Sequence, residues 1–136
     1  MPRNQRTNLA EVKEMDIGNI YKKLNDARMD AAVGIKHVAV ASGQELGYHV
    51  AEITRQVAPH VHLHGDEIYH VLSGRGVMYI GQTKFKDEAP VNVKWEKPYD
   101  VIPGDVFNIP EGYAHSLKNS GDQPLIVAFM CPHTHL

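Results

Sequence analysis

Residues 104–119 have the sequence GDVFNIPEGYAHSLKN, in which turn-forming residues flank a short apolar stretch. Ile102-Pro103-Gly104 and Pro110-Glu111-Gly112 each suit a tight turn, because proline presets one backbone angle and glycine accepts conformations that other residues avoid. The segment that follows the second turn leads through His115 to Asn119. We therefore predict two short strands joined by a turn, with His115 near the start of the second strand.

A second segment, HVHLHGDE, begins at His60 and is the densest cluster of metal-ligand side chains in the chain. Side chains alternate faces along a strand, so His60, His62 and His64 are expected on one side, and the Gly-Asp pair that follows returns Glu67 toward them. Two imidazoles and a carboxylate suit divalent transition metals such as iron, manganese, nickel, cobalt, copper and zinc. The spacing does not choose between the pairs His60/His62 and His62/His64, and alternate histidines on a solvent-facing strand would give the same pattern.

Both segments resemble the two sequence motifs of the cupin superfamily. The second motif is G-x5-P-x-G-x2-H-x3-N, and its fixed positions are filled by Gly104, Pro110, Gly112, His115 and Asn119. The first motif is G-x5-H-x-H-x3-4-E-x6-G, and it is matched at His60, His62, Glu67 and Gly74. Thr54 stands where the first motif begins with glycine, a departure that concerns the backbone and no metal ligand. The two motifs together identify the chain as a member of the small single-domain cupins.

This resemblance implies an all-β double-stranded β-helix, or jelly-roll barrel, that holds one divalent transition metal per chain. The implied ligands are His60, His62, Glu67 and His115, with one or two coordination positions open to water or substrate. The family spacing selects the pair His60/His62 and leaves His64 at the mouth of the barrel.

Strand alternation extends the prediction beyond the ligands. If Glu67 points inward, Tyr69 and Val71 do so too, and an inward His115 implies an inward Leu117. Tyr69 is therefore the candidate catalytic residue, as a hydroxyl in the pocket. Its alternative role is simple packing, since buried tyrosines commonly serve the core.

The remaining sequence fits one β domain preceded by a helical extension. Apolar residues at three-and-four spacing predict a helix over residues 16–29, within an N-terminal extension of residues 1–33, and residues 34–136 form the predicted barrel domain. The predicted strands are Ile35–Ala41, Tyr48–Val57, His60–His64, Glu67–Leu72, Val77–Gly81, Val91–Trp95, Asp105–Ile109, Ala114–Asn119 and Leu125–Met130.

Three further features complete the local predictions. Residues 83–99 are charged and are predicted to form a protruding hairpin. His133 and His135 repeat the alternate-histidine spacing but have no carboxylate partner, so we expect a frayed chain end. Cys131 is expected to be a buried structural thiol.

Composition excludes several functional classes. The formal net charge of the 136 residues is −2 and no long run of like charges occurs, which argues against a nucleic-acid or membrane-surface partner. The sequence shows neither a secretory signal nor a stretch of about 20 apolar residues. A single cysteine fits a reducing compartment, so we expect a cytoplasmic protein.

Three functions are compatible with these observations. The first is a metalloenzyme that acts on a small polar metabolite, of the dioxygenase or the sugar-isomerase type. The second is a non-catalytic cupin that binds or senses a small molecule, and the third is a structural role for the metal. The resemblance also implies a homodimer, since small cupins often associate through their outer sheets.

Overall fold

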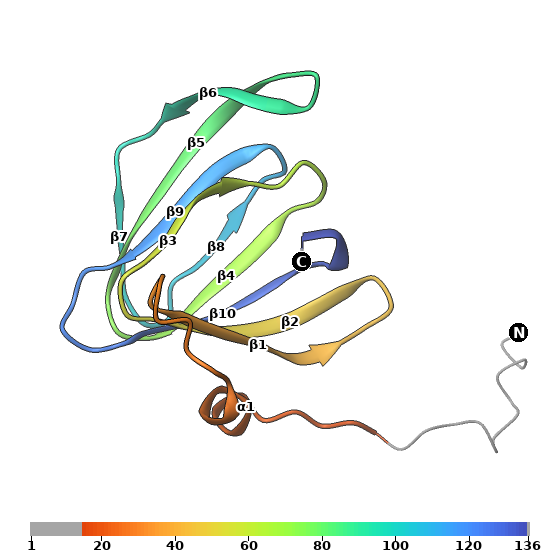
Figure 1. The fold of residues 1–136 in the computed structure, drawn as a ribbon, viewed down its shortest axis with the longest axis vertical. Coiled ribbons are helices and arrows are strands. Elements are labelled where there is room, and N and C mark those ends of the chain that lie inside the picture. The colour runs from red at the N-terminus through yellow and green to blue at the C-terminus, as the bar shows by residue number, and fades with distance from the viewer. Residues whose placement is uncertain (1–14, 136) are drawn as a thin grey trace, which may run out of the picture.

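The computed structural model describes residues 15–135, which form ten strands and one short α-helix (Figure 1). One sheet contains β1 (Ile35–Ser42), β2 (Leu46–Ile53), β4 (Glu67–Ser73), β8 (Val106–Ile109) and β10 (Leu125–Pro132), in the order β1-β2-β10-β4-β8. The other contains β3 (Gln56–Val61), β5 (Gly76–Lys86), β6 (Ala89–Trp95), β7 (Tyr99–Val101) and β9 (Tyr113–Asn119), in the order β3-β9-β5-β6 with β7 also paired to β5. Every strand pairing is antiparallel, and the predicted all-β jelly-roll fold is confirmed.

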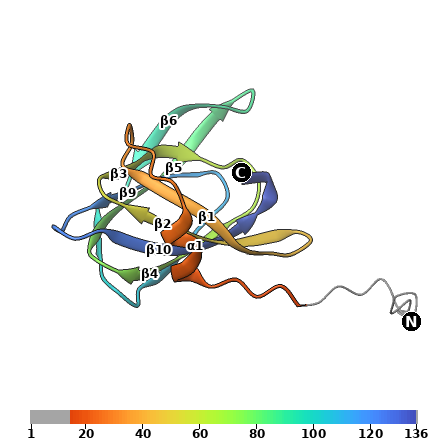
Figure 2. The ribbon, with the colours of Figure 1, turned by 60° about the horizontal axis from the view of Figure 1, so that its bottom comes forward.

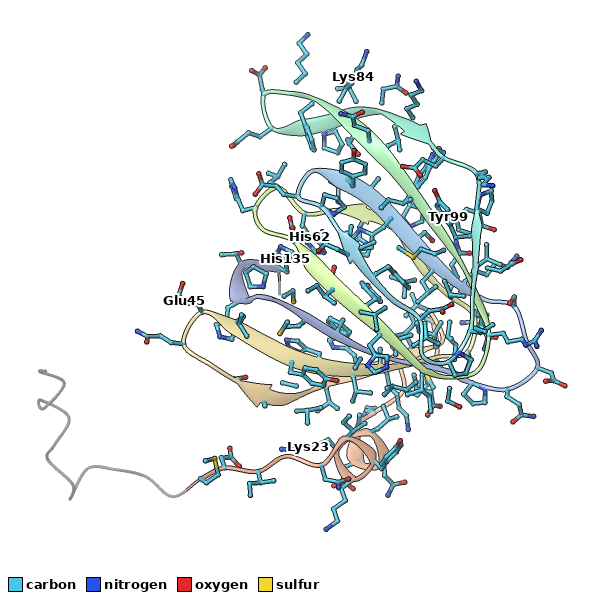
Figure 3. The ribbon with its side chains drawn as sticks, turned by 180° about the vertical axis from the view of Figure 1, so that it is seen from behind. Lys23, Glu45, His62, Lys84, Tyr99 and His135 are labelled. Atoms are coloured by element: carbon cyan, nitrogen blue, oxygen red, sulfur yellow. The ribbon has the colours of Figure 1, made fainter. Side chains whose placement is uncertain are left out.

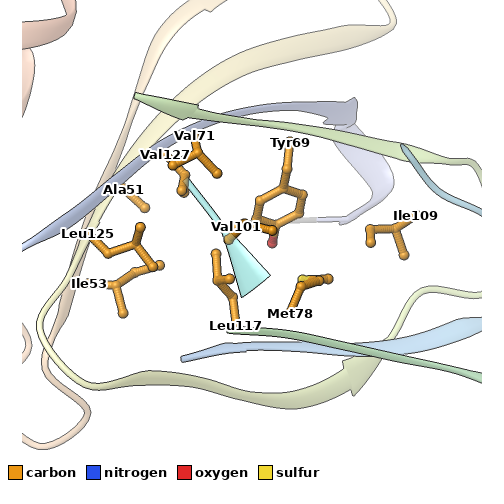
Figure 4. Close-up of a cluster of buried hydrophobic side chains, with 10 residues drawn as sticks. All are labelled: Ala51, Ile53, Tyr69, Val71, Met78, Val101, Ile109, Leu117, Leu125 and Val127. Atoms are coloured by element: carbon orange, nitrogen blue, oxygen red, sulfur yellow. The ribbon is translucent and has the colours of Figure 1, made fainter. Parts of the chain in front are cut away.

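The core lies between the two sheets and is built by strand alternation. In β4, the inward positions Glu67, Tyr69 and Val71 are buried, whereas the intervening positions are partly or fully exposed. Leu117 lies on the inward face of β9 and packs in the same cluster (Figure 4). The predicted inward orientation of these side chains is therefore confirmed.

Helix α1 (Ile20–Asp26) is shorter than the predicted helix. Asn19 caps its first turn, because the side-chain oxygen accepts hydrogen bonds from the backbone nitrogens of Tyr21 and Lys22. The helix packs against β1 and β2 (Figure 2), and its side chain Leu24 is buried. The division of the chain at residues 33 and 34 remains a prediction.

Two predicted strands need correction, and one strand was not predicted. The predicted strand His60–His64 is a strand only at His60 and Val61, where β3 ends. The predicted strand Tyr48–Val57 is divided into β2 and β3, because the chain passes from one sheet to the other at Thr54 and Arg55. β7 (Tyr99–Val101) was not predicted, since three residues are too few for an alternating pattern to be recognised. The hairpin predicted within residues 83–99 is confirmed as β5 and β6, and it extends beyond the other strands (Figure 1).

Backbone geometry explains part of the motif pattern. Gly104 and Gly112 have φ angles of 95° and 81°, a region that glycine enters at no steric cost. Thr54 is not among the positive-φ residues of the described chain, and its hydroxyl donates a hydrogen bond of 2.8 Å to the carbonyl of Gly34. The departure from the motif at Thr54 is therefore accommodated without backbone strain.

Candidate metal centre

Strand pairing brings together the four residues proposed as ligands. β3 and β9 pair in a register that places His60 directly opposite His115, and His62 follows the end of β3. Glu67 begins β4 in the opposite sheet. One ligand-type atom of each of these four residues lies within 4.8 Å of the corresponding atoms of the other three. The two sheets therefore converge on a single cluster, which we call the four-residue cluster.

The interior of this cluster contains polar atoms that have no hydrogen-bond partner. Glu67 is 4% exposed and His115 is 1% exposed, and within the described part of the chain neither Glu67 Oε1 nor His115 Nε2 makes a hydrogen bond. Glu67 Oε1 lies 3.3 Å from His115 Nε2 and 3.4 Å from His62 Nε2. Buried polar atoms are normally paired, and a cation among these atoms would satisfy all of them. The residues present therefore fit a metal ion.

Backbone carbonyls orient two of the imidazoles. His60 Nδ1 lies 2.9 Å from the carbonyl oxygen of Ala58, and His115 Nδ1 lies 3.5 Å from that of Tyr113. A ring that donates its Nδ1 proton to a carbonyl keeps a lone pair on Nε2, the usual arrangement for a metal-binding histidine. Both rings are thus held in an orientation suited to coordination.

The electrostatics of the cluster favour an ionised Glu67 and a neutral His60. Burial alone would raise the pKa of Glu67, but the imidazoles of His115 and His62 outweigh it and lower that pKa to about 2. Burial, with a further contribution from His115, lowers the pKa of His60. A carboxylate and neutral imidazoles are the forms that bind divalent metals.

His64 is not part of the four-residue cluster. β3 ends at Val61, so strand alternation no longer applies at His64, whose side chain is exposed. The backbone carbonyl of His64 forms a hydrogen bond with the ring of His135.

Tyr69 lies in the core beside the cluster. Its ring is 5% exposed, stacks against Phe107 and Phe129, and meets His115 edge-on with centroids 6.0 Å apart. The hydroxyl points away from β4 toward the strands that carry Met78 and Leu117 (Figure 4). Burial, followed by the negative charge of Glu67, raises the pKa of Tyr69 well above its usual value, so the phenol stays protonated.

The C-terminal residues are ordered against the site, so the expectation of a frayed end is wrong. A 3-10 turn spans His133–His135. His133 Nε2 lies 2.8 Å from the carbonyl oxygen of Gly43, and His135 Nε2 lies 2.5 Å from that of His64. The ring of His135 stacks on that of His62, with centroids 3.9 Å apart and planes 5° from parallel (Figure 3). The sequence carried no signal for these contacts, because their partners are distant along the chain.

Two further inward side chains adjoin the cluster. Cys131 is buried, as predicted, and burial together with the charge of Glu67 raises its pKa to about 11. His49 is 3% exposed and stacks on Phe129, and its Nε2 has no hydrogen-bond partner. The sequence left the orientation of His49 open, and the burial of Ala51 and Ile53 two and four residues later now places it on the inward face of β2.

A cavity of about 210 Å³ opens beside the cluster. It is lined by Ile35, His37, Ala51, Ile53, Val57, His60, His62, Glu67, Tyr69, Val127, Phe129, Cys131 and His135. A larger cavity of about 530 Å³, which includes residues of β5, β7 and β8, contains none of the four clustered residues. Two of its acidic side chains already have partners, since Glu96 accepts a hydrogen bond from Tyr99 and Asp105 accepts one from the backbone of Ile102. The smaller cavity is therefore the better candidate for a site of chemistry.

Comparison with known proteins identifies the family. The cupin family model matches residues 50–135, more than half of the chain, and the protein belongs to this family. A relative from Methanocaldococcus jannaschii, described as an uncharacterized protein, is 28% identical over 96 residues. That match covers 68% of this chain and 64% of the relative, so the chain spans less than two thirds of the relative's length.

Solved structures show the same fold at low sequence identity. KdgF from Halomonas sp. has a TM-score of 0.64 and 18% identity, with 88% of this chain and 96% of that chain covered. The cupin domain of Cnp3 from Schizosaccharomyces pombe has a TM-score of 0.68 and 13% identity, with 88% of this chain and 76% of that chain covered.

Within residues 15–135, the structure contains no helix long and apolar enough to cross a membrane.

Proposed function

We propose that this cupin binds a divalent transition metal through His60, His62, Glu67 and His115 and acts as a metalloenzyme on a small molecule in the adjacent cavity. The observation that carries the proposal is the convergence of three imidazoles and one carboxylate around buried atoms that have no hydrogen-bond partner. When bound, such a metal supplies a Lewis acid that orients and polarises oxygen atoms of a substrate.

Other side chains of the site provide negative charge, a hydrogen-bond donor and an apolar lining. Glu67 contributes negative charge, because its pKa of about 2 keeps it ionised at neutral pH. The protonated hydroxyl of Tyr69 is available as a hydrogen-bond donor to a molecule in the cavity, the role predicted from the sequence. The apolar residues that line the cavity limit the access of water to the cluster.

The lining of the cavity narrows the class of substrate. Most lining side chains are aliphatic or aromatic, and none of the described residues that form it is lysine or arginine. A phosphate or a second carboxylate would therefore find no fixed positive charge besides the metal. The volume of about 210 Å³ is below the range of about 300–1,000 Å³ typical of sites for drug-sized ligands. This lining favours a small substrate with an apolar body and one or two oxygen donors, and among the enzyme types it favours a dioxygenase over a sugar isomerase.

Elemental analysis of matched variants tests the metal site. The wild-type protein, His115→Ala and His64→Ala are each loaded with one of the candidate metals and dialysed together. We expect His115→Ala to hold one ion per chain fewer than the wild type, whereas His64→Ala retains the wild-type content. Equal metal content in all three proteins would contradict the proposed ligand set.

Oxygen consumption by the iron-loaded protein tests the reaction type. Small enols and diketones, which combine oxygen donors with an apolar body, are the substrates to screen. We expect oxygen uptake that Tyr69→Phe reduces and His115→Ala abolishes. Conversion of aldose sugars without oxygen uptake would instead support the isomerase type.

A further inference from the structure

A second group of metal-ligand atoms shares Glu67 with the four-residue cluster. A carboxylate oxygen of Glu67, the thiol sulfur of Cys131 and a ring nitrogen of His135 lie within 4.8 Å of one another. We call these three residues the thiol site. They come from β4, from β10 and from the C-terminal turn, and all three line the cavity beside the four-residue cluster.

The hydrogen bond of His135 leaves one of its ring nitrogens free toward this site. His135 Nε2 lies 2.5 Å from the carbonyl oxygen of His64, so it carries the proton and leaves the lone pair on Nδ1. His135 Nδ1 is buried and has no hydrogen-bond partner among residues 15–135. The same arrangement, a ring nitrogen bonded to a carbonyl and the other free, holds His60 in the four-residue cluster.

Burial and hydrogen bonds also hold the other parts of the thiol site in place. Cys131 and Glu67 are 2% and 4% exposed. His133 holds the C-terminal turn in place through the carbonyl of Gly43, and His135 is stacked on His62. An unpaired buried imidazole nitrogen beside a thiol and a carboxylate is an unfavourable arrangement unless a ligand joins them.

We propose that Glu67, Cys131 and His135 bind a second divalent metal ion, adjacent to the first and sharing Glu67 with it. One sulfur, one nitrogen and one oxygen ligand suit Zn²⁺ and similar ions, and three protein ligands leave a coordination position open. A carboxylate shared between two ions is compatible with the separation of about 3.5–4 Å found in two-metal sites. Binding breaks the S–H bond of Cys131, forms a metal–sulfur bond and releases the proton to solvent.

Cobalt titration followed by absorption spectroscopy tests this inference. Cys131 is the only cysteine of the chain, so a thiolate-to-cobalt charge-transfer band in the near ultraviolet reports on this site alone. We expect the metal-free wild-type protein to bind two Co²⁺ per chain with such a band. Cys131→Ser is expected to bind one Co²⁺ without the band. In His135→Ala, the Co²⁺ affinity that the band reports should fall at least about tenfold.

Two control variants separate this site from the four-residue cluster. His60→Ala removes a ligand of the cluster only, so it should lose one Co²⁺ and keep the thiolate band. His64→Ala preserves the carbonyl that orients His135 and should leave both ions in place. A wild-type protein without a thiolate band at saturating Co²⁺ would overturn the inference, as would a band that His135→Ala leaves unchanged. A band that disappears in His60→Ala would show that the thiol binds the metal of the cluster, and it would overturn the second site while leaving the proposed function intact.

Discussion

Glu67 is the residue on which both groups of metal-ligand atoms depend. It is buried between the sheets, and its charge is stabilised by His62 and His115 rather than by lysine or arginine. The buried His49 and the half-buried His60 are neutral imidazoles close to it, since desolvation lowers the pKa of each. These three side chains make the stability of the metal-free protein sensitive to protons.

Acidification is expected to destabilise the metal-free protein in two stages. The unfolded histidines bind protons near pH 6.5, whereas folded His60 and His49 bind them only at lower pH, so stability decreases as the pH falls below about 6.5. The pKa of Glu67 falls from 4.5 to about 2 on folding, so a second loss follows as the pH falls from about 4.5 toward 2. Urea unfolding of the chelator-treated protein between pH 3 and pH 8 measures both stages. A stability that stays constant from pH 8 to pH 5 would contradict the environment described for His60 and His49.

Asn119, a motif residue outside the proposed ligand set, connects several strands through its side chain. Asn119 Nδ2 donates to the carbonyl oxygens of Ile53 and Gln123 at 3.0 and 2.8 Å, and its Oδ1 accepts from the backbone nitrogen of Gly121 at 2.9 Å. One side chain thus links the end of β9 to the end of β2 and to the turn before β10. These hydrogen bonds fix the end of β9, the strand that also carries His115 four residues earlier.

Asn119→Ala is expected to destabilise the fold without removing the metal. Loss of these three hydrogen bonds should lower the free energy of unfolding by about 1.5–4.5 kcal/mol, because each one contributes about 0.5–1.5 kcal/mol. Thermal unfolding of the metal-free variant measures the loss, and elemental analysis at a temperature well below the transition measures the metal. Wild-type stability would contradict the structural role of Asn119, and loss of the metal from folded protein would show a more direct one.

Local patterns allowed much of the site to be predicted. The spacing of the two motifs identified the four clustered residues, and alternation along β4 gave the inward orientation of Tyr69. The passage between sheets at Thr54 and Arg55 was missed, since neither residue is a strong breaker of strands. The position of His135 was also missed, because its partner His64 lies 71 residues earlier and only the folded barrel brings the two together.

At the scale of the whole molecule, the two sheets act as the rigid support of the site. Their shared core includes Val71 and Val127 from one sheet and Leu117 from the other, each at most 1% exposed. Because the proposed ligands come from both sheets, a bound ion would add a connection across the barrel. The homodimer inferred from the family resemblance and the cytoplasmic location both remain predictions.

Metal binding should therefore stabilise the entire fold. A ligand that binds only the native state contributes about 2.7 kcal/mol at a concentration 100 times its dissociation constant. We expect calorimetry to show a higher melting temperature for the metal-loaded protein than for the chelator-treated one, with the difference reduced in His115→Ala. An identical melting temperature with and without metal in the wild type would contradict binding between the sheets.

Anomalous diffraction from crystals of the metal-loaded protein tests the central claim most directly. The account predicts an anomalous peak about 2.0–2.2 Å from one nitrogen each of His60, His62 and His115 and from an oxygen of Glu67. A fully loaded protein whose anomalous peaks all lie away from these four side chains would contradict it.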